Sequence, residues 1–426
     1  MFDYNLIIVG GGASGCMAAI QAARLGLKVA LFERLDKLLA KVRASGGGRC
    51  NLTNTLDQKD FIKRFGRDGK FIIPALQAFD SQKLREFFAE IGVETVAHDG
   101  FRVFPAGHDS QLVNHALQQQ LQHPAIKVFT GSLVDGLIVE NGKVLGISCG
   151  REKHFSDTVI LASGGRGYPA LGGSDSGLKM AAQAGHSIVG PFPAMLPLRC
   201  RETWVEKCRA DTIGKAKISI DLDGYRKFSA TGDLIFTNDG IRGPVVLDFA
   251  REITPLLEKF TEVPLLLDLC GGLNEEQILQ KIKKLSFENE KDGIAAIISR
   301  FLPVELAKVM CQLAQADENL RFSKLAGQTR ERLLKILVAT PVTVVGHAGF
   351  EHAMVTRGGV SLKEIDPRTL ASRLVQGLFF CGEMVDLDGP CGGFNLQWAF
   401  SSGFLAARSV GNYISAEKKS AEPGQF

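Results

Sequence analysis

The first 33 residues alternate between apolar runs and a glycine-rich turn. Residues 4–9 form a short apolar run, residues 16–25 continue with a small, apolar helix pattern, and residues 28–32 form a second apolar run. Short apolar runs bounded by glycines are typical of buried strands, so the expected order is strand, turn, helix, strand. This order predicts the first unit of a parallel α/β sheet.

Helical and strand patterns follow in turn up to residue 165. They cover residues 82–91 and 111–121 for the helices, and residues 127–139, 143–148 and 158–162 for the strands. Asn141-Gly142 lies between two of these strands and is a strong hairpin signal.

From about residue 195 the pattern changes to short alternating strands and then to helices. The alternating strands cover residues 215–220, 227–229 and 233–237. Beyond residue 272 apolar residues recur at helical spacing, as at Ile278, Ile282 and Leu285. Near Pro341 strands and glycine turns return, and residues 378–381 form another apolar strand.

These changes predict one dinucleotide-binding domain that is built from both ends of the chain and interrupted by an inserted domain. Its two parts would cover residues 1–194 and 342–412, and the inserted domain, β-rich and then helical, residues 195–341. Residues 413–426 are charged and lack a periodic apolar face near the end of the chain, so we expect a flexible tail.

Composition excludes several classes of protein. The chain has 426 residues, of which 45% are hydrophobic, and this supports large cores. The net charge of +4 is small and Lys and Arg are scattered, so we expect no nucleic-acid partner. No stretch approaches the ~20 apolar residues that span a membrane, and no signal-peptide core is visible. Nine cysteines without paired spacing predict neither disulfides nor a metal site and favour the cytoplasm.

The glycine turn predicts a dinucleotide site. Gly10, Gly12 and Gly15 have the spacing G-x-G-x-x-G between a strand and a helix, and Glu33 ends the next strand. Such a turn brings the backbone close to a pyrophosphate at the N-terminus of the helix, and the acidic residue accepts hydrogen bonds from the ribose. The expected contacts are Gly10, Gly12, Ala13, Ser14, Gly15, Glu33 and Arg34.

Further glycine clusters favour FAD over a nicotinamide cofactor. A second cluster, from Ser45 through Gly46, Gly47, Gly48, Arg49 and Cys50 to Asn51, follows early, and others lie at Gly164 and at Gly382-Glu383. Several glycine-rich strand ends that converge on one ligand indicate a long cofactor held along the edge of the sheet. The alternative for the second cluster is a flexible loop.

A second match to the dinucleotide pattern, at residues 165–170, is rejected. Pro169 and the glycines that follow break the helix that would have to begin there. Any NAD(P)H must therefore visit the flavin without a Rossmann domain of its own, or the reductant is the substrate itself.

The catalytic acid or base is not identified by any pattern. Cys50 and Cys391 lie in glycine-rich turns without a redox-active pair spacing, so they are expected to be packing residues. His347 is a candidate for proton transfer, with a structural hydrogen bond as the alternative. Arg49 and Arg357 are candidates for a substrate carboxylate or the flavin edge, with surface ion pairs as the alternative.

Five segments resemble the HI0933-like family of bacterial NAD(P)/FAD-dependent oxidoreductases, which is related to aminoacetone oxidase and bile-acid dehydrogenase. They are SGGGRCNLTN (45–54), GFRVFP (100–105), GDLIFTNDGIRGPVVLDFAR (232–251), VTRGGV (355–360) and GLFFCGEMVDLDGPCGGFNLQWAFSSG (377–403). The resemblance extends to about Arg408. Two residues depart from the family pattern, Arg242 where a Ser is expected and Arg357 where an Ala is expected.

The resemblance implies a fold and a set of cofactor contacts. The fold is α/β, a glutathione-reductase-like FAD-binding Rossmann domain with an inserted β-barrel and helical domain. The implied contacts beyond the first turn are Ser45 to Asn51, Val134, Ala162, Ser163, Gly164, Gly382, Glu383, Gly392, Gly393, Phe394, Asn395 and Leu396. The last five open a helix whose N-terminus can stabilise negative charge on reduced flavin.

Two classes of function remain open. The first is an FAD-dependent oxidoreductase that transfers hydride between flavin and a small organic substrate, by amine oxidation or enone reduction, with NAD(P)H or oxygen as second substrate. The second is an FAD-binding module in RNA modification or regulation, against which the small net charge argues. The oligomeric state is not predicted.

Overall fold

The computed structural model describes residues 3–421 and divides the chain into two compact units. The first unit combines residues Met1–Pro191 and Val355–Phe426, and the second is the insert Phe192–Met354. Each unit has its own hydrophobic core. No helix within residues 3–421 is long and apolar enough to cross a membrane.

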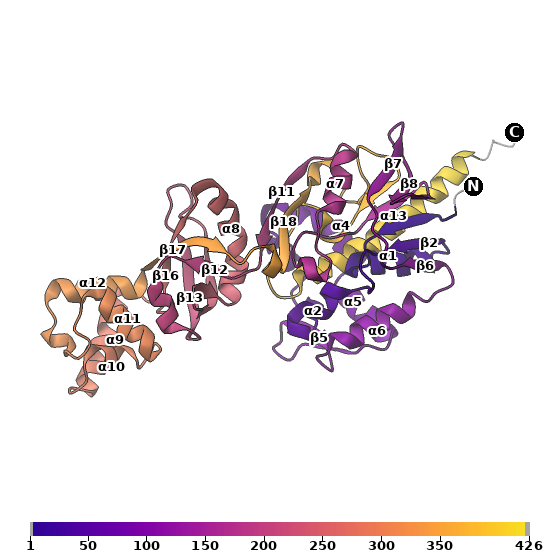
Figure 1. Cartoon of the computed structure of the whole chain (residues 1–426). Coiled ribbons are helices and arrows are strands. Elements are labelled where there is room, and N and C mark those ends of the chain that lie inside the picture. The colour runs from indigo at the N-terminus through magenta and orange to yellow at the C-terminus, as the bar shows by residue number, and fades with distance from the viewer. Residues whose placement is uncertain (1–2, 422–426) are drawn as a thin grey trace. The chain divides into compact units, whose positions relative to one another are not determined.

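A five-stranded parallel sheet forms the centre of the first unit (Figure 1). The strand order is β19 (Leu378–Phe380), β10 (Val159–Leu161), β1 (Leu6–Val9), β2 (Val29–Phe32) and β6 (Ile126–Phe129). Every residue of β1, β2, β10 and β19 is buried, which explains why these strands are continuous apolar runs. The last strand in the sequence, β19, pairs with β10, so both ends of the chain build one sheet.

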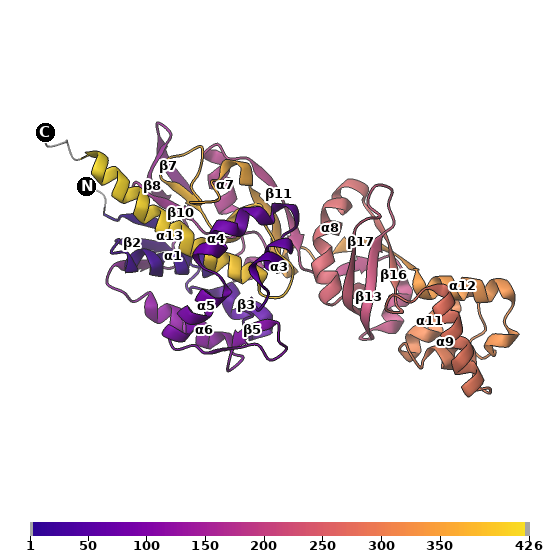
Figure 2. The same cartoon turned by 180° about the vertical axis from the view of Figure 1, so that it is seen from behind.

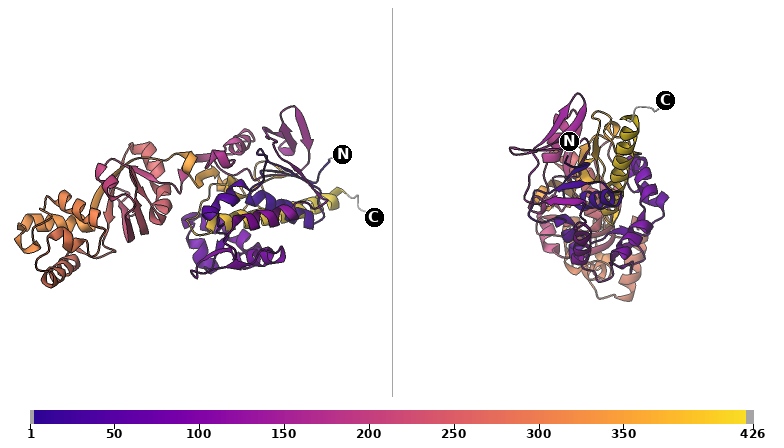
Figure 3. Two further views of the ribbon diagram at one scale, coloured as in Figure 1. Left: turned by 60° about the horizontal axis from the view of Figure 1, so that its bottom comes forward. Right: turned by 90° about the vertical axis from the view of Figure 1, so that its right-hand side faces the viewer.

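Two helices pack against each other beside this sheet. α1 (Ala13–Arg24) follows the glycine turn, and the long helix α13 (Phe394–Ala421), yellow in Figures 2 and 3, runs across the first unit. Gly403 of α13 lies so close to the Ser14 carbonyl that a Cβ would collide with it. The close approach of the α1 and α13 backbones therefore explains why residue 403 is a glycine.

The remaining elements of the first unit form smaller layers. The helices are α2 (Ala40–Ala44), α3 (Gln58–Lys63), α4 (Ile73–Ala78), α5 (Ser81–Glu90), α6 (Ser110–Gln120) and α7 (Ser176–Gln183). The strands are β3 (Thr53–Asn54), β4 (Thr95–Val96), β5 (Arg102–Pro105), β7 (Gly136–Glu140), β8 (Lys143–Cys149), β9 (Glu152–Phe155) and β18 (Val355–Val360). The strand β11 (Ile188–Ala194) begins in the first unit, and its last three residues belong to the insert.

The insert contains a closed barrel and helices that lie in sequence between its strands. The barrel order is β12 (Leu198–Cys200), β15 (Gly240–Arg242), β14 (Ser229–Phe236), β13 (Thr212–Ile220), β16 (Val263–Asp268) and β17 (Thr340–His347). The helices are α8 (Pro244–Phe260), α9 (Glu275–Glu288), α10 (Ile294–Ile298), α11 (Val304–Ala314) and α12 (Gly327–Val338). The predicted fold class, a Rossmann domain with an inserted barrel and helices, is confirmed.

Three local expectations need correction. The strand expected at residues 127–139 is two strands, because β6 joins the parallel sheet and only β7 forms the hairpin with β8. β17 belongs to the barrel, which it closes by pairing with β16 and β12, so the insert extends past residue 341. The expected flexible tail is helical as far as Ala421. Residues 422–426 of that tail lie outside the described residues.

Candidate functional site

The turn after β1 has the geometry of a phosphate-binding turn. Gly10 has a φ of +110°, and a Cβ there would lie 2.5 Å from the Ala162 carbonyl oxygen. Gly15 lets α1 lie close to the turn after β1, because a Cβ on Gly15 would collide with the Gly10 carbonyl. Gly12 faces open space, and no side chain caps the N-terminus of α1. The first N–H groups of α1 are therefore available to an anion such as a diphosphate.

Glu33 follows β2 at the rim of this turn. Its Oε2 accepts a hydrogen bond from Gly11 N at 2.7 Å, and its Oε1 accepts one from Leu35 N at 2.8 Å. These bonds fix the carboxylate, and each oxygen keeps a further lone pair that a ribose hydroxyl could use. The sequence pattern did not predict the two backbone contacts.

A cavity opens beside Glu33. It is lined by Val9, Gly10, Phe32, Glu33, Arg34, Ser132, Leu133, Val134, Ser163, Gly172, Ser174 and Ser176. Arg34 Nη2 donates to the carbonyls of Pro169 and Gly173, both at 3.3 Å, and so ties the loop after β10 to the end of β2. The structure therefore brings Glu33, Val134 and Ser163, which were predicted from distant parts of the sequence, to one cavity.

The second glycine cluster forms a tight turn after α2. Gly46, Gly47 and Gly48 have φ values of +59°, +66° and +85°, and a Cβ on Gly47 or Gly48 would meet no atom within 4 Å. Cys50 is buried, and burial raises the pKa of its thiol to about 11. The thiol is therefore protonated at neutral pH, as expected of a packing residue. Arg49 Nε donates to the Gly46 carbonyl at 3.1 Å, and this bond closes the turn.

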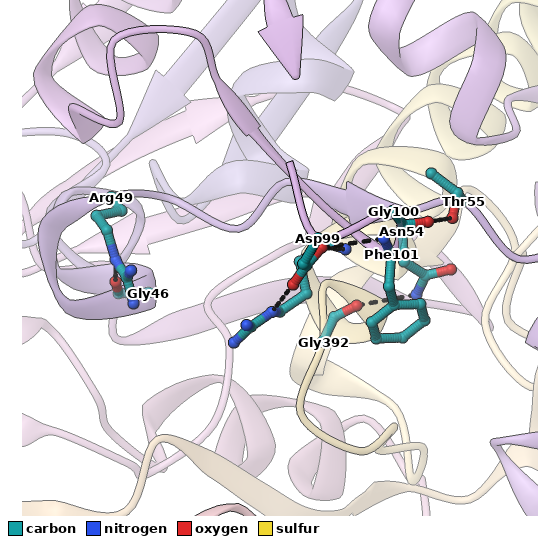
Figure 4. A network of polar contacts seen from close by, with 9 residues as sticks. Gly46, Arg49, Asn54, Thr55, Asp99, Gly100, Phe101 and Gly392 are labelled. Atoms are coloured by element: carbon teal, nitrogen blue, oxygen red, sulfur yellow. Dashed lines mark hydrogen bonds and ion pairs between the residues drawn. The ribbon is translucent and has the colours of Figure 1, made fainter. Parts of the chain in front are cut away.

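The turn before α13 is bound to β3 (Figure 4). Asn54 Nδ2 donates to the Gly392 carbonyl at 2.9 Å. In the orientation that satisfies its neighbours, the Asn51 amide accepts a hydrogen bond from Gly393 N at 3.1 Å. Gly393 has a φ of +84°, and its Cβ would overlap the backbone of Thr53. The second glycine cluster and the start of α13, about 340 residues apart in sequence, are therefore connected through one short strand.

The first residues of α13 differ in their contacts. Asn395 Oδ1 accepts from Gly389 N and Asn395 Nδ2 donates to Gly389 O, both at 2.8 Å, so its amide stabilises the preceding loop. Phe394 is buried, whereas Leu396 is half-buried. Contacts of Asn395 and Leu396 with a flavin ring stay a prediction.

Glu383 connects four segments of the first unit. Its Oε1 accepts from Thr356 N at 2.6 Å, and its Oε2 lies 3.2 Å from Lys41 Nζ. The same carboxylate is adjacent to Gly164 and Gly165, where a Cβ would lie 3.7 and 2.9 Å from its oxygens. Lys41 was missed in the sequence because a lone lysine in a short helix carries no signal of a partner so distant in the chain.

The remaining catalytic candidates are divided between the two units. His347 ends β17 in the insert, where its Nδ1 accepts from Gly349 N at 3.0 Å. Burial, and then the charge of Arg199, lower the pKa of His347, so the ring is neutral at pH 7. Arg242 also belongs to the insert, at the end of β15. Arg357 lies in β18 of the first unit and helps to lower the pKa of Asp386, which burial raises.

The residues of the first unit fit FAD. An uncapped helix N-terminus, open space over Gly12, a fixed carboxylate and a lined cavity are the donor set that an adenine dinucleotide needs. The fold and this site define the class of protein, an FAD-dependent oxidoreductase. The chain belongs to the HI0933-like family, because the model of the HI0933-like protein Rossmann domain matches residues 4–409.

Relatives align over almost the whole chain. The 3-dehydro-bile acid delta(4,6)-reductase of Clostridium scindens is 32% identical, with 95% of this chain and 98% of the relative covered. The ribosomal RNA dihydrouridine synthase of Haemophilus influenzae is 28% identical, with 95% and 98% covered.

A solved structure shares the fold. The 3-ketosteroid delta1-dehydrogenase of Sterolibacterium denitrificans is 13% identical, with 96% of this chain and 99% of that chain covered and a TM-score of 0.52.

Proposed function

We propose that this chain reduces a carbon–carbon double bond conjugated to a carbonyl group. The observation that carries the proposal is the 32% identity to a bile-acid delta(4,6)-reductase along both chains. The name 3-dehydro-bile acid indicates a ketone, and delta(4,6) indicates double bonds in its rings. Enone reduction is therefore favoured over amine oxidation.

FAD, when bound, supplies the hydride for this reaction. The chain itself would hold the cofactor: the N-terminus of α1 would bind the diphosphate, Glu33 the ribose, and Val134 and Ser163 the adenosine end. The turn Gly392-Gly393 and Gly382 would lie along the ribityl chain. The buried thiol of Cys50 stays protonated, and this favours a packing role over a redox role.

A second candidate substrate is a uracil base in RNA. It is supported by two full-length relatives at 28% and 27% identity that are ribosomal RNA dihydrouridine synthases. Uracil contains the same kind of bond, a double bond conjugated to a carbonyl, and dihydrouridine lacks it. The two candidates thus share one reaction and differ in the molecule that carries the double bond.

The test uses the FAD-loaded protein reduced without oxygen by one equivalent of dithionite. It is mixed with a 3-keto-4-ene steroid, with a simple cyclic enone, with uridine and with a uridine-containing RNA. We expect one of these to restore the oxidised flavin spectrum and to gain two hydrogens by mass spectrometry. Free reduced FAD in the same buffer is the control. If small amines instead bleach the oxidised protein and no conjugated alkene reoxidises the reduced protein, the proposal is wrong.

A further inference from the structure

Two buried side chains beside the start of α13 have polar atoms without a partner. Thr53 of β3 and Gln397 of α13 are both fully buried, with 0% of each residue exposed. Within residues 3–421, no group of the protein hydrogen-bonds the Thr53 Oγ1 or the Gln397 Oε1. Such burial costs free energy, because the oxygen gives up its bonds to water and gains none in return. A bound group that hydrogen-bonds these atoms would recover that free energy.

Both residues contact Gly393, in the turn that is predicted to cover the flavin. Gln397 N donates a hydrogen bond to the Gly393 carbonyl at 3.1 Å. Gly393 lies so close to β3 that a Cβ on it would be 2.6 Å from the Thr53 Cα. The fold thus brings two unpartnered polar groups, from distant parts of the chain, to a single glycine of this turn.

The bonds around these residues determine which atoms are left without a partner. In the orientation that satisfies its neighbours, the Asn51 amide donates to the Thr53 carbonyl at 3.0 Å. Gln397 Nε2 donates to the Phe79 carbonyl at 3.1 Å and to Ser401 Oγ at 2.8 Å. A carbonyl only accepts, so the Gln397 amide is fixed with its oxygen pointing elsewhere. What remains is one hydroxyl, which can donate and accept, and one amide oxygen, which accepts.

We infer that Thr53 is a further cofactor contact, whose hydroxyl hydrogen-bonds the flavin ring of FAD. The polar edge of that ring carries carbonyl oxygens and an N–H group, and so offers acceptors and a donor. The Thr53 hydroxyl would bind an acceptor of the ring, and the Gln397 Oε1 would accept from its N–H. The inference depends on FAD as the cofactor and not on the substrate that is reduced.

A valine at position 53 separates this role from a purely structural one. Valine has nearly the shape of threonine and is equally suited to a strand. Without FAD, Thr53→Val should stabilise the protein, because a methyl group replaces an unpartnered hydroxyl. With FAD, the same change removes a hydrogen bond to the cofactor. The variant is therefore expected to be more stable and yet to bind FAD more weakly.

The test measures the FAD dissociation constant, the flavin absorption bands, and the Tm of the full-length protein with and without FAD. Thr53→Ser is the conservative variant, because it keeps the hydroxyl. The matched control is Thr254→Val in α8 of the insert. Thr254 is 1% exposed, and its Oγ1 likewise has no partner in the part of the chain that the structure describes.

We expect Thr53→Val to raise the Tm of the FAD-free protein by about 2–4 °C. It should weaken FAD binding by a factor of about 3–10 and shift the absorption bands of the bound flavin. The gain in Tm should be smaller with FAD, since weaker binding stabilises the loaded protein less. Thr53→Ser should bind FAD nearly as the unaltered protein does. Thr254→Val should raise the Tm equally with and without FAD and leave the affinity unchanged.

Three results would overturn the inference. Unchanged FAD affinity and absorption bands in Thr53→Val would show that a buried water is the only partner of the hydroxyl. Equal loss of affinity in Thr53→Ser and Thr53→Val would assign the effect to packing. A lower Tm of FAD-free Thr53→Val, or its failure to fold, would show that the hydroxyl has a partner within the protein. None of these measurements involves a substrate, so failure here is distinguishable from failure of the proposed reaction.

Discussion

Gly12 and Gly15, three residues apart at the start of α1, are required for different reasons. A Cβ on Gly12 would meet no atom within 4 Å, whereas a Cβ on Gly15 would collide with the Gly10 carbonyl. We expect Gly12→Val to fold with the Tm of the FAD-free unaltered protein and to purify without FAD, because the side chain fills the space of the diphosphate. Gly15→Val should lower the Tm or prevent folding. Flavin absorbance per protein and thermal unfolding measure both effects, and a Gly12→Val protein with full FAD would refute the assignment.

Glu33 should contribute to FAD binding through its charge. Glu33→Ala is expected to weaken FAD binding by roughly 1–3 kcal/mol, since hydrogen bonds to a charged acceptor are the stronger kind. Glu33→Gln is the matched control, because it keeps one acceptor for the backbone N–H of Gly11 or Leu35. The measurement is the dissociation constant of FAD on reconstituted apoprotein. An alanine variant with unchanged affinity would show that Glu33 only shapes the turn.

The ion pair between Lys41 and Glu383 should position the loops around the cofactor. Both side chains are partly exposed, at 30% and 22%, so the pair is worth only ~0.5–1 kcal/mol. Lys41→Met is expected to weaken FAD binding by a factor of about 2–5, which corresponds to that energy. Lys41→Arg should restore it, because the charge is kept. Equal affinities of the methionine variant and the unaltered protein would exclude this role.

At the scale of elements, His186 joins the end of α7 to two loops near β19. Its side chain is fully buried, its Nε2 lies 2.9 Å from Ser372 Oγ, and its Nδ1 lies 3.3 Å from Glu364 Oε2. Burial lowers the pKa of His186, although Glu364 acts in the opposite direction. The folded protein therefore takes up this proton less readily than the unfolded chain.

Stability should consequently fall as the pH drops below about 6.5, the ordinary pKa of histidine, because protonation favours the unfolded state. His186→Gln removes this proton and should show a smaller fall in Tm between about pH 7 and pH 5. The hydrogen bond from Ser187 and the proximity of His186 hold the pKa of Glu364 low, so its own contribution is lost only at more acidic pH. Parallel Tm curves for the variant and the unaltered protein would refute this.

Local patterns predicted some elements well and others poorly. Asn141 and Gly142 have φ values of +49° and +75°, as a two-residue hairpin requires, so the hairpin was predictable from two residues. The sheets that β6 and β17 join were not predictable, because the choice of sheet depends on partner strands far away in the sequence. The helical pattern of the last residues was missed since α13 is stabilised by packing on α1 rather than by its own periodicity. Near the end of α13, the Glu417 carboxylate also accepts hydrogen bonds from Tyr413 and Lys143.

At the scale of the whole molecule, residues 3–421 contain one Rossmann turn, at Gly10 to Gly15. At the second formal match, Pro169–Leu171 is a short 3-10 turn and α7 begins only at Ser176, so no helix N-terminus follows the glycines directly. We expect NADH or NADPH, if either reduces the flavin, to do so with a rate that rises linearly with its concentration. Anaerobic stopped-flow absorbance measures this. Saturation at low micromolar cofactor would contradict it, since that requires a preformed phosphate cradle.

The sequence by itself determined the dinucleotide turn, the acidic end of β2, the hairpin and the family. Each of these depends on the conformational preferences of single residues or on spacings within a few dozen residues. Both can be read directly from the amino-acid types. Only the tertiary structure decided that Lys41 meets Glu383 and that β17 closes the barrel. The same holds for the bond between Asn54 and the Gly392 carbonyl: these residues are 338 positions apart in the sequence, so only the fold of the first unit brings them together, and no local pattern expresses such a contact.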